Sequence, residues 1–124
     1  SSAASDVYKR QLIASSEWFA FVPAKEYFDE PGDHADELET SVMMHYHPEL
    51  VNLDEAGDGN YKKFASQMLN EKVAWIPRNW QNVSQDTGIG NPKKASAGKG
   101  KKYAEAVVAK YALLFEELVH KELY

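Results

Sequence analysis

The clearest hydrophobic pattern lies near the C-terminus and predicts a long amphipathic helix over residues 93–122. Apolar residues recur there at three- and four-residue spacings, which place them on one buried stripe of a helix. The stripe consists of Ala104, Val107, Val108, Tyr111, Phe115, Leu118 and Val119. Pro92 can occupy the first helical position, with Asn91 as the cap. Gly98 and Gly100 each weaken a helix by about 1 kcal/mol relative to alanine, so we expect a firm helix only after Gly100.

A second helix is predicted over residues 33–47, and it ends before Pro48 because the residue preceding a proline disfavours helical geometry. One face of this helix is apolar and consists of Ala35, Val42 and Tyr46. Glu39 projects into the middle of that face. A carboxylate is costly to bury unless it is paired, hydrogen-bonded or bound to a metal. We therefore expect Glu39 to be buried for a reason, while the polar face holds Asp36, Glu37 and Thr40.

Two short apolar runs predict strands. Residues 12–20 are apolar and aromatic, and Pro23 follows them; residues 73–76 are ended by Pro77. The continuous apolar character of the first run suits a sheet that is covered on both faces. Residues 61–69 predict a short helix. The resulting order of strand, helix, loop, strand and helix indicates an α/β fold class.

Residues 1–11 carry no amphipathic pattern and resemble a tag, a fusion scar or a translated adapter. We expect them to form a non-native or disordered leader, and the alternative is a genuine flexible N-terminal segment. The fold is expected to occupy residues 12–124.

Composition narrows the functional classes. The chain has 124 residues, which is one domain or a piece of one, and a net charge of −5, which argues against an extended nucleic-acid footprint. It has no cysteine, so disulfides, thiolate metal sites and a cysteine nucleophile are excluded. No apolar run approaches about 18 residues, and no secretory signal pattern is present, so no membrane contact and a cytoplasmic location are expected.

The candidate chemistry lies at the start of the second helix. Asp33 and His34 open it, and Glu39 follows five residues after the histidine. An acid–histidine pair with a second acid nearby is typical of a reaction site. Each residue also has a structural interpretation: Asp33 as an N-cap, His34 as an exposed first-turn histidine, and Glu39 as a structural ion pair.

The run from His34 to Met44, followed by residues 47–51, resembles the creatininase family of metal-dependent amidohydrolases. The family pattern there is His-Ala/Gly-x-x-x-Glu-Thr-Ser, an apolar segment, and Pro-Asp/Glu-Leu-Val. Residues 90–100 resemble the family's Gly-Asp-Pro-x-x-Ala-Ser/Thr-x-Glu-Lys-Gly entry to its last helix. The motifs occur in the right order, and the resemblance covers residues 12–124. Asn91 and Gly98 replace the usual aspartate and glutamate.

The resemblance implies part of a three-layer α/β/α sandwich, incomplete at the N-terminal side. Family members hold two divalent metals, zinc or manganese, with Glu-x-His and Asn-Gly-His segments that this sequence lacks. It implies hydrolysis of a non-peptide, cyclic or formyl C–N amide bond of a small molecule, by a complete enzyme that is a homo-oligomer. The 124-residue chain alone is expected to be inactive and to hold no metal ligand. The alternative is a non-catalytic fragment or interaction module that retains the motif helix for folding.

By the same resemblance, His34 passes a proton to the leaving nitrogen and is expected to border a concave surface. Asp33 matches an acidic position near the substrate, and Glu39 matches the glutamate that supports the site. Trp75 and Trp80 are expected to be packing residues. The lysines at the start of the last helix are expected to form a solvated face, which consists of Lys93, Lys94, Lys99, Lys101 and Lys102.

Overall fold

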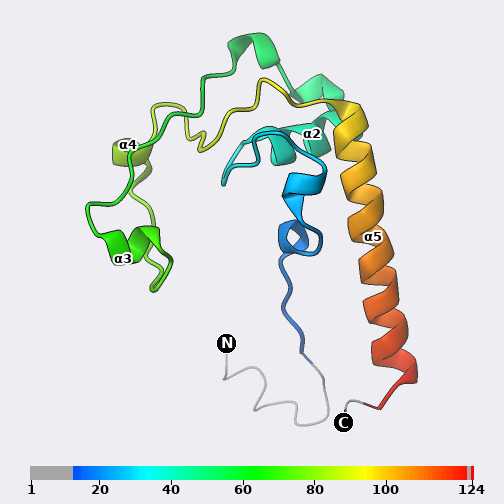
Figure 1. Cartoon of the computed structure of the whole chain (residues 1–124). Helices are drawn as coiled ribbons and strands as arrows, with labels where there is room; N and C mark the ends of the chain where they lie inside the picture. Colours follow the sequence, from blue (N-terminus) through cyan, green and yellow to red (C-terminus); the bar gives the residue numbers. More distant parts are fainter. Residues whose placement is uncertain (1–12, 123) are drawn as a thin grey trace.

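Two helices dominate the computed structural model, which describes residues 13–122 and residue 124 (Figure 1). They are α2 (Glu37–Tyr46) and α5 (Ala97–His120). The remaining elements are short: η1 (Trp18–Ala20), η2 (Ala24–Glu26), η3 (Pro48–Leu50), η4 (Leu53–Glu55), α3 (Gln67–Asn70) and α4 (Trp80–Val83). The described part of the chain contains no β-strand, only two isolated bridges.

Both predicted strands are wrong over the described residues. Residues 18–20 form η1, and residues 73–76 lie in a bend and an irregular segment. The first apolar run and the residue after it pack on α5: the Trp18 ring meets Tyr103, and the Phe21 ring meets Tyr111. The second run is exposed to solvent. An apolar run forms a strand only where another strand is available to pair with it, and none is present in this part of the chain.

The helix α2 begins later than the sequence predicts. Ala35 has a φ of +47°, a left-handed conformation that an α-helix cannot contain, so residues 33–35 stay outside it. Asp36 is the N-cap, and its carboxylate accepts a hydrogen bond from the Glu39 amide at 2.9 Å. The structural interpretation of Asp33 as the N-cap is therefore wrong. The helix ends at Tyr46, one residue before the predicted end.

The long helix α5 is confirmed, but its predicted cap is wrong. Ser96 is the N-cap, and its hydroxyl accepts a hydrogen bond from the Lys99 amide at 3.3 Å. Pro92 instead lies in a preceding turn, where its carbonyl accepts from the Ala95 amide at 2.8 Å. The expectation of a firm helix only after Gly100 is also wrong, because the helix is continuous from Ala97 through both glycines.

The core lies where α2, α5 and the segment before α2 meet. Its central residue is Tyr103, which is fully buried, and its hydroxyl donates to the Phe19 carbonyl at 2.9 Å. Burial raises the pKa of the Tyr103 phenol, so the hydroxyl keeps its proton and remains a donor. The buried cluster consists of Val22, Phe28, Leu38, Tyr103 and Val107.

The predicted stripe of α5 is buried only in its N-terminal half. Ala104 and Val107 are buried, as expected. Further along the helix, large apolar side chains are more than half exposed: Val108, Leu113, Phe115 and Val119. Figure 1 shows why, since the C-terminal half of α5 extends beyond α2 and the short elements around it.

The contact between α2 and α5 is close and contains buried polar groups. Ser41 of α2 is fully buried, and its hydroxyl accepts from the Ser96 amide at 3.1 Å. Glu37 is also fully buried, and one of its oxygens lies 2.5 Å from Lys99 Nζ. Lys99 therefore neutralises a buried carboxylate, and the expectation that it joins a solvated face is wrong. A cation beside a buried carboxylate removes the main cost of burying that charge.

Residues 57–90 form an arm that carries α3 and α4, on the opposite side of the molecule from α5 (Figure 1). Its two sides are joined where the Lys62 amide donates to the Val83 carbonyl at 2.8 Å, and where Gly90 donates to Gly59 at 3.0 Å. The predicted helix over residues 61–69 shortens to α3. Within the described residues, no helix is both long and apolar enough to cross a membrane.

Candidate functional site

The backbone of His34 is fixed by the last loop of the arm. Its amide donates to the Ile89 carbonyl at 3.1 Å, and its own carbonyl accepts from the Ile89 amide at 2.8 Å. Asp33 donates to the same Ile89 carbonyl at 2.8 Å. One residue earlier, the Gly32 amide donates to the Asp36 carboxylate at 2.5 Å. These bonds fix the turn before α2, so that only the side-chain torsions of His34 remain free.

The imidazole of His34 lies near both a carboxylate and an indole. Its Nδ1 atom is 3.6 Å from Glu39 Oε2, and its ring centroid is 5.0 Å from that of Trp80. The same Glu39 oxygen accepts from the Ala35 amide at 2.7 Å, which holds the carboxylate near the ring. The His34 side chain is 45% exposed, so a molecule from solution can reach it.

The expectation that Glu39 is buried is wrong, because its side chain is 38% exposed. The buried carboxylates of α2 are Asp36 and Glu37, which the sequence placed on the polar face. Ala35 lies outside the helix, so it cannot define the buried face. That face is instead set by the buried residues Leu38, which lies in the core cluster with Tyr103 of α5, and Ser41, which is bonded to the N-cap of α5.

Asp33 forms an ion pair that the sequence did not predict. Its Oδ1 atom lies 2.6 Å from a guanidinium nitrogen of Arg78, and each side chain is about one-third exposed. The same guanidinium lies 5.5 Å from the centre of the Trp80 ring. No sequence spacing links residues 33 and 78, so only the tertiary structure shows the role of Arg78. Trp80, expected to be a packing residue, lies against the candidate catalytic histidine.

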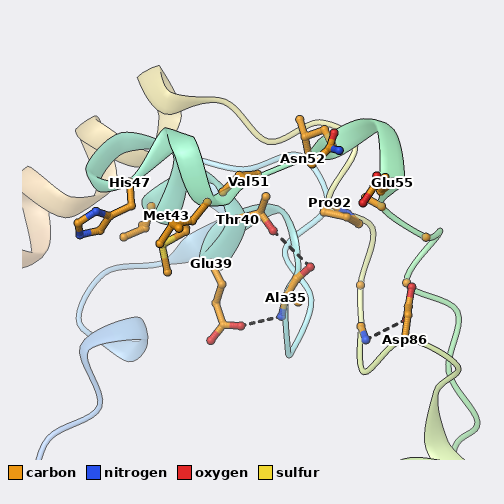
Figure 2. A pocket seen from close by; sticks show the side chains of 18 of the residues that line it. Ala35, Glu39, Thr40, Met43, His47, Val51, Asn52, Glu55, Asp86 and Pro92 are labelled. Atoms are coloured by element: carbon orange, nitrogen blue, oxygen red, sulfur yellow. Dashed lines mark hydrogen bonds between the residues drawn. The ribbon is translucent and has the colours of Figure 1, made fainter.

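A cavity of about 750 Å³ opens beside the site (Figure 2). Ala35, Glu39 and Thr40 line it, whereas His34 itself is not among the lining residues. The prediction that His34 borders a concave surface is therefore not borne out at this cavity, which Ala35 and Glu39 line instead. Most of the lining is apolar and comes from α2 and the turns after it, with Met43, Tyr46, Leu50, Val51 and Leu53.

Asp86 supplies a negative charge to the cavity, on the arm side in Figure 2. Its carboxylate accepts hydrogen bonds from the Gly88 amide and the Ser84 hydroxyl, both at 3.0 Å. The Gly88 bond first, and then the Ser84 bond, hold the pKa of Asp86 below its usual range. The group is therefore ionised near neutral pH and can orient a polar or cationic part of a ligand.

A divalent metal centre does not fit the described residues. Over residues 13–122 and 124, no group of three or more histidine, cysteine, aspartate or glutamate side chains is placed to hold a metal ion. His34 and Glu39 provide only two metal-binding groups, and these face each other rather than a shared position for a metal ion. A metal centre at this site therefore needs ligands from outside the described residues.

The comparisons with known proteins agree on one family. The sequence profile of the family "Creatininase: Creatinine amidohydrolase" matches residues 2–115. A crystal structure from Bacteroides fragilis NCTC 9343, described as "Putative creatinine amidohydrolase", matches with 55% sequence identity and a TM-score of 0.89. The match covers 99% of this chain and 49% of that one, so this chain spans about half the length of that protein.

No curated protein matches the chain. The expected leader at residues 1–11 lies outside the described residues and stays a prediction, although the profile match begins at residue 2. The match over most of the chain shows a creatininase-like fold, whereas the three-layer sandwich stays a prediction. The sequence motifs, the fold and the profile lead to the same conclusion: this chain belongs to the creatininase family.

Proposed function

We propose that this chain supplies one wall of the active site of an amidohydrolase that cleaves a non-peptide C–N bond in a small molecule. The observation that carries the proposal is the placement of His34, which is accessible to solvent and lies next to both the Glu39 carboxylate and the Trp80 ring. Family membership supports the reaction class. We further propose that divalent metal, zinc or manganese, is held by residues beyond the described part of the protein.

His34 is proposed to move a proton. Breaking a C–N bond requires that the leaving nitrogen receive a proton, and imidazole is the side chain suited to this transfer near neutral pH. Because Nδ1 faces Glu39, the opposite nitrogen, Nε2, is the one directed away from the carboxylate and free to meet a substrate.

The substrate is proposed to be a small cyclic or formyl amide. The cavity beside Glu39 is large enough for such a molecule, and its few polar side chains would fix the orientation of an amide within an otherwise apolar lining. Asp33 is proposed to support the site rather than to hold the substrate directly, because its carboxylate is already bound to Arg78. We also propose a cytoplasmic homo-oligomer as the working form of the enzyme.

The test uses the longest available form of the protein with bound metal. Creatinine and a panel of cyclic and formyl amides are offered, and release of the amine product is followed. We expect His34→Gln to lower kcat by about 100-fold or more, the scale of a lost proton-transfer group. Metal content, measured by mass spectrometry, should stay unchanged. His120→Gln, at the end of α5, is the matched control and should keep full activity.

Full activity of the His34→Gln variant would overturn the proposed role. If no amide is hydrolysed by the metal-loaded protein, the interaction-module alternative gains support. The observation that favours this alternative is the exposed apolar surface on the C-terminal half of α5, where Phe115 and Val119 are at least 60% exposed. Exposed apolar surface of this kind is typical of a protein–protein contact.

A further inference from the structure

We propose that Arg78 and Trp80 are positioning residues that hold the His34 imidazole in its orientation toward Glu39. The importance of this orientation for catalysis rests on the proposed function. The orientation itself does not, and it can be measured separately. Neither residue belongs to the sequence motifs that identify the family here, and both lie on the arm, more than 40 residues after His34 in the chain.

The first step of the argument is the restraint on the histidine ring. The paired backbone bonds to Ile89 fix the main chain of His34, which leaves the ring to rotate about its side-chain bonds. Glu39 lies 3.6 Å from Nδ1, and the centroid of the Trp80 ring lies 5.0 Å from that of the imidazole, with an angle of 47° between the two ring planes. A ring that meets two separate side chains has fewer available rotamers, and Trp80 supplies the contact that the helix α2 does not.

The second step is the restraint on Trp80 itself. Arg78 has its guanidinium 5.5 Å from the Trp80 ring and forms an ion pair with Asp33 at 2.6 Å. Asp33 precedes His34 in the chain, so the contacts run from Asp33 to Arg78, from Arg78 to Trp80 and from Trp80 back to His34. We call this closed series of contacts the circuit. The planar guanidinium can bind a carboxylate and lie against an aromatic ring at the same time, which an ammonium group does less well.

The third step is the attachment of the arm. Trp80 begins α4, and Tyr61 and Ser84 form a bridge that ties this part of the arm to its other side. The apolar side chain of Trp75, also on the arm, is 83% exposed and takes no part in the circuit. Trp80 therefore differs from Trp75, because its ring contacts the His34 imidazole. A role in packing the arm alone does not account for this contact.

The test follows the ring protons of His34 in the 124-residue chain by NMR. Their resonances are assigned by their disappearance in His34→Gln. The Trp80 indole displaces them through its ring current, and we expect Trp80→Ala to remove that displacement. Trp80→Phe should retain part of it, since it keeps an aromatic ring at the same place. Trp75→Ala is the matched control and should leave the His34 resonances unchanged.

Arg78 is tested in the same spectra. Arg78→Met should move the His34 resonances in the direction of Trp80→Ala, although Arg78 reaches His34 only through Trp80 and Asp33. Arg78→Lys should give an intermediate displacement, because lysine keeps the ion pair and loses the stacking. The amide spectrum of α2 and α5 shows whether each variant is folded. If Trp80→Ala unfolds the chain, the Trp80→Phe variant is used in its place to test the proposal, because it preserves an apolar ring.

The proposal is overturned if a folded Trp80→Ala or Trp80→Phe variant leaves the His34 ring resonances at their original positions. If the His34 ring resonances are unchanged in Arg78→Met, Arg78 is not a positioning residue. In the metal-loaded enzyme, Trp80→Phe should lower kcat by up to about 100-fold with little change in KM, because a misplaced proton donor affects the chemical step. An active His34→Gln variant would overturn the proposed function and leave the ring-current result standing, so the two failures are distinguishable.

Discussion

The two glycines in the first turns of α5 should respond to alanine in opposite ways. At Gly98, an added Cβ would meet nothing within 4 Å. At Gly100, the same atom would overlap the Ser41 carbonyl and lie 2.8 Å from the Val42 amide nitrogen. The sequence alone treats the two positions alike, since both are glycines in a helix. The structure separates them, because the backbone of α2 lies so close to Gly100 that it leaves no room for a Cβ.

The magnitudes follow from two competing effects. Alanine in place of a helical glycine stabilises a helix by about 1 kcal/mol, so Gly98→Ala should raise the free energy of unfolding by that amount and Tm by about 3–5 °C. At Gly100 the gain is offset by overpacking, which costs about 1–3 kcal/mol in a well-packed interior. The upper end applies, because the clashing atoms are backbone and α2 must shift as a whole. We therefore expect a net loss of about 2 kcal/mol for Gly100→Ala.

Urea unfolding followed by circular dichroism measures both variants against the parent chain. The slopes against urea should match, since neither change alters the surface exposed on unfolding. A shift of α2 also moves Glu39, so the His34 ring resonances should change in Gly100→Ala and not in Gly98→Ala. If the two variants are equally stable, the close approach of α2 and α5 at Ser41 is not as described, and the reasoning fails.

Two further outcomes concern stability. The Lys94 ammonium, 2.6 Å from Glu30, holds the pKa of that carboxyl below its usual range. On acidification the unfolded chain therefore takes up more protons than the folded one, and stability falls with pH below about 4. Lys94→Met should flatten this fall in thermal scans, whereas Lys102→Met should not. Tyr103→Phe removes the bond to the Phe19 carbonyl and should cost about 1 kcal/mol in urea unfolding, and an unchanged midpoint would contradict this.

The sequence predicts the parts of the site that lie close together along the chain. His34 lies in the turn before α2 and Glu39 in the first turn of that helix, five residues later, so local geometry suffices to bring them together, and the structure places them 3.6 Å apart. Arg78 and Trp80 could not be found this way, because they reach the site through the fold of the arm. The expectation that Glu39 is buried failed for a related reason. The buried face of α2 is set by its contact with α5, far along the chain, and not by the pattern within α2.

The predicted strands fail for a different physical reason. A helix satisfies its backbone hydrogen bonds within itself, so α5 could be predicted from its own residues. A strand satisfies them only with a partner, and an apolar run carries no information about whether that partner is present. Residues 73–76 have the composition of a strand, yet Val73 and Trp75 are more than 70% exposed. Composition indicates what a segment can form, and neighbouring segments decide whether it does.

The two sequence motifs of the family are joined in the structure into one unit. Ile89, next to the second motif, forms the paired backbone bonds with His34 of the first. Gly90 has a φ of +119°, which favours glycine, and a Cβ on it would lie 2.8 Å from the Cα of Gly32. Glycine at both positions therefore allows the turn before α2 and the entry to α5 to touch. The residue just before the motif that begins the last helix thus fixes the backbone of the candidate catalytic histidine, so the two motifs are held together in the fold.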